Sequence, residues 1–396
     1  MHGNIQEKAY RRGGSRVYDN WERLVAAVLK REQLRQLTLS HSFTSSISAD
    51  FDSRSSFDFS LEDLPASRFS SETISMETPS VPSILSDGVV RPIKLKELKK
   101  ATRHFLRADV FFEQGAWSPV LKAWIDEHTL TASKPGFGIP VTVKKWNAEG
   151  LQAHEEWSKE LNYLSQLRHP NVVKLVGYCS EEDNMILVYE FLPRGSLDNY
   201  LFRRGHPTLP WAIRIKVAIG VARGLSFLHD KEKPAMHQIF TTATILLDGY
   251  EYNAKLCNFS SARDGPTGDM TIESTPVMGA YSYAAPEYIA TGQLTAKCNV
   301  YSFGVVLLEL LFGELIIDRT RASKEHNVAE WAETYLRDKR KLLQVMDPKL
   351  EEQYPRNEAY DVVTIAKQCL STKPERRPRM AEVLVALEKL QGPKTL

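Results

Sequence analysis

The sequence predicts an α+β fold in two lobes. We expect a small lobe built on an antiparallel sheet, a mainly helical large lobe and a largely disordered N-terminal extension. The chain has 396 residues, which is long for one compact domain and enough to bury a large core. Apolar residues recur at helical spacing over 209–230, and 300–313 is typical of a buried helix because only Glu309 interrupts its apolar run. A series of motifs, described below, fills 91–391 and begins with strand-like segments.

Composition indicates an ordinary globular protein with an unusual N-terminal part. Hydrophobic residues make up 42% and charged residues 25% of the chain, and the net charge of +2 gives no signal for nucleic-acid binding. The four cysteines are scattered without metal-ligand spacing, which favours a reduced, cytoplasmic setting. We find no transmembrane run and no secretory signal, and expect a cytoplasmic protein.

The first 38 residues form a basic segment with a predicted amphipathic helix. They carry eight Lys/Arg against four Asp/Glu. Over 21–37, Trp21, Leu24, Val25, Val28 and Leu29 recur at helical spacing. This helix packs on the following fold or on a partner, docks at the periphery of an anionic membrane, or stays disordered; the sequence leaves these three alternatives open. Gly3 is out of register for N-myristoylation, which needs Gly directly after Met.

Residues 39–90 form a predicted disordered linker. The first fifty of them, 39–88, contain sixteen serines and carry eight Asp/Glu against two Lys/Arg. Such a composition buries too little apolar surface to offset the entropy lost on ordering the chain. The linker is either a phosphorylation or docking segment or an inert tether.

From residue 91 onward, motifs follow one another in a fixed order. A lead-in strand and helix (91–105) precedes a strand-turn-strand at 110–126, the strand VTVKKW (141–146) and a helix and strand at 154–179. A further strand runs into a hinge at 185–201. The large-lobe motifs are ILLD (245–248), NFS (258–260), AAPEY (284–288) and PERRPRM (374–380).

This order resembles the plant receptor-like cytoplasmic kinases over 91–391, which implies a small lobe at 91–191 and a large lobe at 192–391. By that resemblance Lys144 would bind the nucleotide phosphates and pair with Glu160, while Tyr189 is the gatekeeper and Glu190 and Leu192 face adenine. Alternatively, the Lys144–Glu160 pair serves only to hold the small lobe together. The full degenerate nucleotide-binding set is Gly115, Val120, Thr142, Lys144, Glu160, Tyr189, Glu190, Leu192 and Leu246.

The residues that perform phosphoryl transfer are replaced in this sequence. Ile239 stands where the family has the aspartate that accepts the substrate proton, and Thr244 and Asn258 stand where it has magnesium ligands. Losing a positioned base costs roughly 10²–10⁴-fold in rate. The complete set of degenerate catalytic positions is Gln238, Ile239, Thr241, Thr244, Asn258, Ser260 and Ala280.

The structural motifs of the resembled family are otherwise kept. Glu287 is expected to pair with Arg377, and Asn299 replaces the aspartate that braces the catalytic loop. Ser274 and Thr275 lie where the family is phosphorylated; they are either substrates of a partner kinase or simply exposed loop hydroxyls.

We therefore interpret the chain as an inactive kinase, a pseudokinase, that acts as scaffold, decoy or allosteric partner of active kinases or immune receptors in plant signalling. It would require no cofactor, bind ATP weakly or not at all, and hold no metal. Two alternatives stay open. One is residual Ser/Thr kinase activity through a substitute acid such as Asp248 or Asp264, and the other is a nucleotide-binding switch without catalysis.

Overall fold

The computed structural model describes residues 90–391, except 107–109, 113–119, 147–150, 204, 231–234, 238–239, 250, 261, 265–281, 317–327 and 337–338. The predicted N-terminal helix and nearly all of the Ser-rich linker lie outside the described residues. The same holds for six of the predicted site residues, namely Gly115, Gln238, Ile239, Ser274, Thr275 and Ala280.

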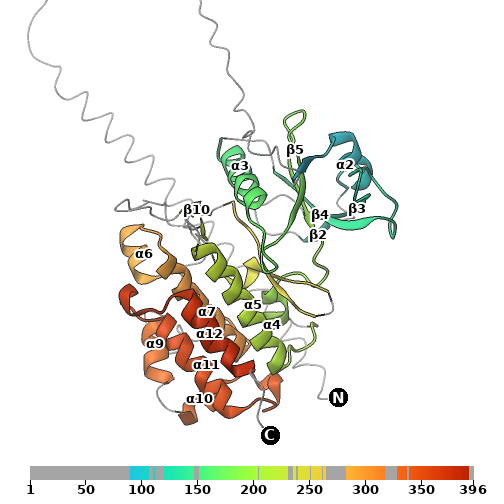
Figure 1. Cartoon of the computed structure of the whole chain (residues 1–396). Coiled ribbons are helices and arrows are strands. Elements are labelled where there is room, and N and C mark those ends of the chain that lie inside the picture. The colour runs from blue at the N-terminus through green and yellow to red at the C-terminus, as the bar shows by residue number, and fades with distance from the viewer. Residues whose placement is uncertain are drawn as a thin grey trace, which may run out of the picture. The chain divides into compact units, whose positions relative to one another are not determined.

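The small lobe is a six-stranded sheet with two helices (Figure 1). Its strands are β1 (Arg91–Pro92), β2 (Val110–Phe112), β3 (Val120–Ile125), β4 (Ile139–Trp146), β5 (Leu175–Cys179) and β6 (Met185–Glu190). They lie in the order β1-β5-β6-β4-β3-β2, and every pairing is antiparallel except that of β1 with β5. The helices are α2 (Leu95–Ala101) and α3 (Leu151–Gln166).

The two faces of this sheet serve different purposes. Val141 and Val143 of β4 are fully buried in a small core that also contains Leu95 and Leu98 of α2. Because strand side chains alternate between faces, Lys144 of β4 lies on the opposite face, where α3 packs. The sheet thus positions the predicted lysine toward the predicted helix.

The large lobe is mainly helical. Its helices are α4 (Leu197–Phe202), α5 (Trp211–His229), α6 (Pro286–Thr291), α7 (Ala296–Phe312), α9 (Val328–Tyr335), α10 (Lys339–Val345), α11 (Arg356–Cys369) and α12 (Met380–Glu388). The lobe also contains two antiparallel strand pairs, β7 (Ala235–Met236) with β10 (Arg263–Asp264) and β8 (Ile245–Leu247) with β9 (Ala254–Leu256). Short 3₁₀ helices occupy Thr242–Thr244, Pro348–Leu350, Pro374–Arg376 and Lys389–Gln391.

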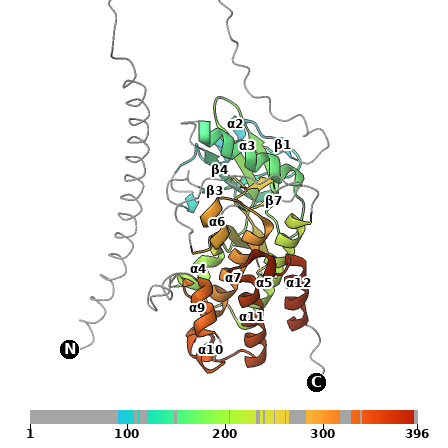
Figure 2. The same cartoon turned by 90° about the vertical axis from the view of Figure 1, so that its left-hand side faces the viewer.

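Helix α7 forms the centre of this lobe. Figures 1 and 2 show it beside α5 and α11, with α12 against α5. Every residue from Cys298 to Phe312 is buried, as the apolar run in the sequence predicted. A Cβ atom added at Gly304 would lie 2.9 Å from the Cβ of Cys369, so α11 packs against the glycine itself. The helix ends at Gly313, whose φ of 65° is a left-handed cap.

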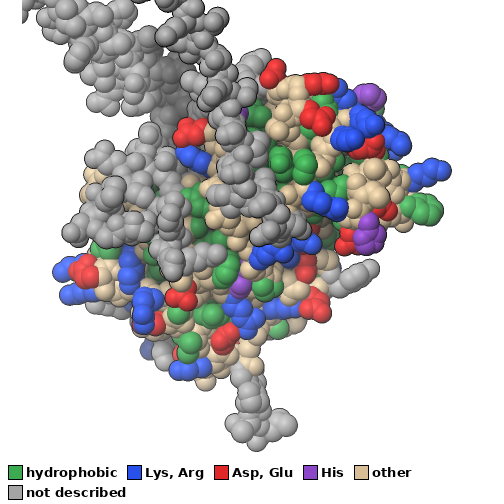
Figure 3. All heavy atoms as spheres, turned by 45° about the horizontal axis from the view of Figure 1, so that its top comes forward, with side chains coloured by type: hydrophobic (Ala, Val, Ile, Leu, Met, Phe, Trp, Pro, Cys, Tyr) green, Lys and Arg blue, Asp and Glu red, His purple; other side chains and the backbone are tan. Residues whose placement is uncertain are grey.

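The two-lobe α+β prediction is confirmed. On the face seen in Figure 3, basic and acidic side chains are interspersed, and the hydrophobic ones form small separate areas. The described part of that face therefore shows no extended field of one charge, in line with the small net charge.

Candidate functional site

The predicted pair on the small lobe is formed. Lys144 Nζ lies 3.0 Å from Glu160 Oε2, which links β4 to α3. Glu160 is only 1% exposed, so its charge needs this partner. The ammonium also lies 4.0 Å from the centre of the Trp146 ring, a cation–π contact that further fixes it.

Tyr189, the predicted gatekeeper, lies beside this pair. Its hydroxyl is buried, and the pKa of that hydroxyl is raised well above its ordinary value, first by burial and then by the nearby Glu160 carboxylate. Thr142 is paired with Tyr189 across β4 and β6, so the two side chains share one face of the sheet. The ion pair and the gatekeeper thus form one buried cluster.

The other predicted nucleotide-binding residues come from both lobes. Val120 is opposite Lys144 in the β3–β4 pair, and Leu246 of β8 bridges to Ser196 before α4. Val120, Thr142 and Leu246 are each half-buried. The Leu192 carbonyl accepts a hydrogen bond from the amide of Gly195 in the hinge turn.

Glu190 makes side-chain contacts that the sequence did not reveal. Its backbone amide donates to the Lys174 carbonyl at 3.0 Å. Its side chain accepts from the Lys174 amide and from Lys255 Nζ, both at 2.8 Å. Since Lys255 lies on β9, this carboxylate ties the hinge to the large lobe.

In the catalytic loop, the threonines at the predicted catalytic positions bond to the loop itself. The Thr244 hydroxyl donates to the Thr241 carbonyl at 2.9 Å and accepts from the Thr241 amide at 3.1 Å. The Thr241 hydroxyl accepts from the Ala243 amide at 3.2 Å. Together they cap the 3₁₀ helix Thr242–Thr244, and both hydroxyl oxygens are engaged within the loop.

The predicted metal-binding loop is likewise internally bonded. Ser260 Oγ donates to Asn258 Oδ1 at 2.9 Å, and Ser260 is buried. Asn258 has φ of 65°, a left-handed conformation that asparagine tolerates better than most residues. Phe259 is fully buried, and its ring centre lies 4.5 Å from that of His237. The two loops are joined by the Cys257 amide, which donates to the Thr244 carbonyl at 3.0 Å.

Asn299 of α7 holds the backbone of the catalytic loop at His237. Its Nδ2 donates to the His237 carbonyl at 2.6 Å, while its Oδ1 accepts from the His237 amide at 3.1 Å. An aspartate accepts but does not donate, so only an amide makes both bonds. His229 Nε2 lies 3.3 Å from the same Oδ1, and burial lowers the pKa of both histidines to about 4. This buried brace is therefore uncharged.

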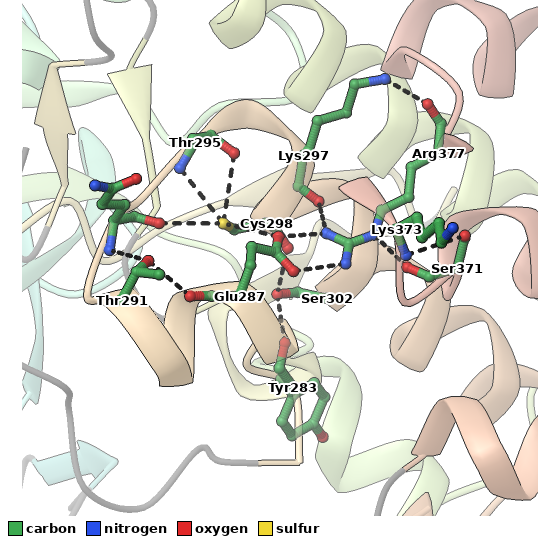
Figure 4. Close-up of polar contacts among 11 residues, drawn as sticks. Tyr283, Glu287, Thr291, Thr295, Lys297, Cys298, Ser302, Ser371, Lys373 and Arg377 are labelled. Carbon is green, nitrogen blue, oxygen red and sulfur yellow. Dashed lines mark hydrogen bonds and ion pairs between the residues drawn. The ribbon is translucent and has the colours of Figure 1, made fainter. Parts of the chain in front are cut away.

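The structural pair predicted in the large lobe is present. Arg377 makes a bidentate contact with Glu287, at 2.6 Å to Oε1 and 2.7 Å to Oε2, and Figure 4 shows the two groups facing each other. Arg377 also donates to the carbonyls of Ser371 and Lys297. The Cys298 thiol lies beside Glu287 in the same cluster. This cluster ties α6, the start of α7 and the segment before α12 together.

Glu309 is a partnered acid that sequence reasoning treated only as an interruption. It accepts from the Tyr283 hydroxyl at 2.6 Å, from the Thr242 hydroxyl at 3.4 Å and from the Ile316 amide at 3.3 Å. Burial raises its pKa to about 8. A single acid in an otherwise apolar helix is the sequence signal that could have predicted these contacts, because a buried carboxyl group needs hydrogen-bond partners.

Of the two substitute acids considered from the sequence, Asp248 has side-chain partners elsewhere, and Asp264 is described by its backbone alone. Both carboxylate oxygens of Asp248 accept from Asn253, at 2.8 and 2.7 Å, and so hold the β8–β9 turn. Asp264 pairs through its backbone with Ala235, in the β7–β10 pair. The hydrogen bonds of Asp248 assign it to the hairpin turn.

Within the described ranges, no group of three or more His, Cys, Asp or Glu side chains is arranged to hold a metal ion. None of the helices described is both long and apolar enough to cross a membrane.

Comparison with known proteins agrees with this architecture. Residues 111–387 match the family described as protein tyrosine and serine/threonine kinase. The probable serine/threonine-protein kinase PBL3 of Arabidopsis thaliana is 51% identical over 351 residues, 88% of this chain and 82% of that protein. Serine/threonine-protein kinase BIK1 of the same plant is 48% identical over 328 residues, 82% of each chain. Receptor-like cytoplasmic kinase 176 of Oryza sativa subsp. japonica is 49% identical over 313 residues, 78% of this chain and 79% of that protein. The chain belongs to the plant receptor-like cytoplasmic kinase family.

Proposed function

We propose that this member of the family is a pseudokinase that does not transfer phosphate. The observation that carries the proposal is what occupies the catalytic positions. Ile239 offers a hydrocarbon side chain where the family needs a proton acceptor. The polar residues at the predicted metal-ligand positions, Thr244 and Asn258, form hydrogen bonds within the loops that carry them.

The residues present do not fit a magnesium ion. Mg²⁺ prefers carboxylate and water oxygens in octahedral geometry. Thr244 and Asn258 are neutral, and each already has a hydrogen-bond partner within its own loop. We propose that ATP binds weakly or not at all, that any binding does not depend on magnesium, and that the protein requires no cofactor.

The test is phosphate incorporation by the purified full chain, with radiolabelled ATP, magnesium and a general protein substrate. The matched control is Lys144→Met, which removes the side chain expected to hold the nucleotide phosphates. The proposal predicts equal, background incorporation in both proteins. Incorporation that Lys144→Met abolishes would establish residual kinase activity instead.

The proposed role is that of a scaffold, decoy or allosteric partner of active kinases or immune receptors. Three structural contacts of the kinase fold support this role, although the catalytic residues are replaced. They are the Lys144–Glu160 pair, the Phe259–His237 packing and the Glu287–Arg377 pair. A fold with these contacts presents a kinase-shaped surface to other proteins. The protein would act in the cytoplasm, and a peripheral membrane contact through 21–37 is one of the three alternatives that the sequence leaves open for that segment. Affinity purification with crosslinking from plant tissue tests this role, because a scaffold should recover active kinases equally well with wild-type and Lys144→Met chains.

A nucleotide-binding switch is the second candidate, and the intact Lys144–Glu160 pair favours it. For a switch, millimolar ATP should raise the melting temperature of the wild-type chain, and Lys144→Met should remove that shift. For a scaffold alone, ATP should shift neither protein.

We also propose that Ser274 and Thr275 are passive substrates of a partner kinase. Mass spectrometry after incubation with a purified active relative should then find phosphate on them. An unmodified segment 258–287 would leave them as ordinary loop hydroxyls.

A further inference from the structure

A cavity of about 280 Å³ lies behind the hinge, on the side of the small lobe where α3 ends. Its floor is apolar and made of buried side chains, namely Leu164, Leu167, Val172 and Leu175. Val90, the first described residue, forms part of the wall. The cavity is therefore open to the chain that enters the fold.

The rim of this cavity is basic. Arg168 and Lys174 line it, and both are exposed. Its one acidic lining residue, Glu190, is already paired with Lys255. His169 also lines the cavity, and its pKa is lowered, first by burial and then by Arg223 and Lys255. An apolar floor with an unbalanced basic rim suits a peptide that carries both apolar and acidic side chains.

The lead-in strand fixes where the preceding chain enters. Strand β1 runs parallel to β5, with Arg91 opposite Gly177 and Pro92 opposite Tyr178. The approach is close, because a Cβ atom added at Gly177 would lie 2.6 Å from Ile93 Cδ1 and 2.8 Å from the Arg91 carbonyl oxygen. The chain thus enters the fold along β5, on the side where Leu175 meets the cavity.

We propose that this cavity is the docking site of the chain's own segment 83–88, Ser-Ile-Leu-Ser-Asp-Gly, which directly precedes the chain's entry at the cavity wall. Only Val89 separates this segment from Val90, which lines the cavity, so the segment reaches the cavity without a long connection. The Asp87 carboxylate then lies beside the basic rim, and Ile84 and Leu85 supply the apolar side chains for the floor. A phosphate on Ser86 adds negative charge next to Arg168 and Lys174 and strengthens the contact.

Hydrogen exchange of the full-length chain tests this docking. The amides of 83–88 should exchange about tenfold more slowly than an unstructured peptide, since a docked segment opens against a free-energy cost. Arg168→Glu with Lys174→Glu should return them to the unstructured rate, and adding Asp87→Lys to that chain should restore part of the protection. The matched control is Lys94→Glu with Lys96→Glu, the same charge change at exposed positions at the start of α2, which should leave the exchange unaltered.

Two results would overturn the proposal. One is exchange of 83–88 at the unstructured rate in the wild-type chain. The other is protection that survives the Arg168→Glu and Lys174→Glu reversal. Ser86→Asp provides the second measurement: it should slow exchange further in the wild-type background and have no effect in the reversed one. An equal effect in both would show that the added charge does not meet this rim.

Discussion

Replacing Asn299 by aspartate tests whether the brace under the catalytic loop is built to be uncharged. The substitution keeps the size of the side chain and converts the donating Nδ2 into a second acceptor. In the wild type Nδ2 lies 2.6 Å from the His237 carbonyl oxygen. A carboxylate oxygen in its place would be repelled by that carbonyl oxygen. Asn299 is 1% exposed, so water does not relieve the new charge.

The cost combines a lost hydrogen bond and an unpaired buried charge, about 3 kcal/mol near pH 8. For a folded part of this size that corresponds to a fall of about 5 °C in melting temperature. The cost also depends on pH, because His229 lies 3.3 Å from the affected oxygen. In the wild type its pKa is lowered to about 4, so its contribution to stability is present above the unfolded value of 6.5 and lost as the pH falls. The new carboxylate would raise that pKa, and the variant should recover stability as the pH falls.

The measurement is thermal unfolding of both proteins from about pH 5.5 to 8.5, with Asn299→Ala as the uncharged control. The difference between wild type and Asn299→Asp should narrow toward low pH, whereas the difference for Asn299→Ala should stay constant. A constant difference for Asn299→Asp, or none at any pH, would refute the neutral-brace reasoning.

Three further predictions concern the large lobe. Arg377→Ala should lower the free energy of unfolding by about 3–5 kcal/mol, measured by chemical denaturation, because it strands the Glu287 carboxylate; a loss under 1 kcal/mol would contradict a stabilising pair. Glu309, whose pKa is raised to about 8, contributes stability at low pH that is lost as the pH rises toward that value, so Glu309→Gln should flatten the decline of melting temperature with pH, and an unchanged slope would count against it. Gly304→Ala should cost about 1–3 kcal/mol by overpacking against α11, while Gly249→Ala, where the nearest atom lies at 3.9 Å, should cost far less; equal losses would contradict the close approach.

Much of the fold was predictable because its signals are local or ordered. The apolar run around Glu309 identified α7, and the helical spacing over 209–230 identified α5. The Lys144–Glu160 and Glu287–Arg377 pairs followed from motif positions, since each is placed by elements the motifs define.

The rest depended on contacts between distant segments. The sequence showed that Asn299 replaces an aspartate, but not that its amide bonds both backbone groups of His237, 62 residues away. The sequence allows Asp248 as a substitute acid, but it does not show that both carboxylate oxygens accept hydrogen bonds from Asn253. Glu190 was expected to face adenine through its backbone, and its side-chain contact with Lys255 depends on how the lobes meet. Spacing along the chain does not encode such contacts.

We propose that the nucleotide site lacks magnesium ligands because Thr244 and Asn258 are neutral and bonded within their own loops. Calorimetric titration of the full chain with ATP, with magnesium and then with a chelator in its place, tests it most directly. We expect weak ATP binding or none, with an affinity that the metal changes by no more than about twofold. Binding that magnesium tightens about tenfold or more, about 1.4 kcal/mol, would contradict it.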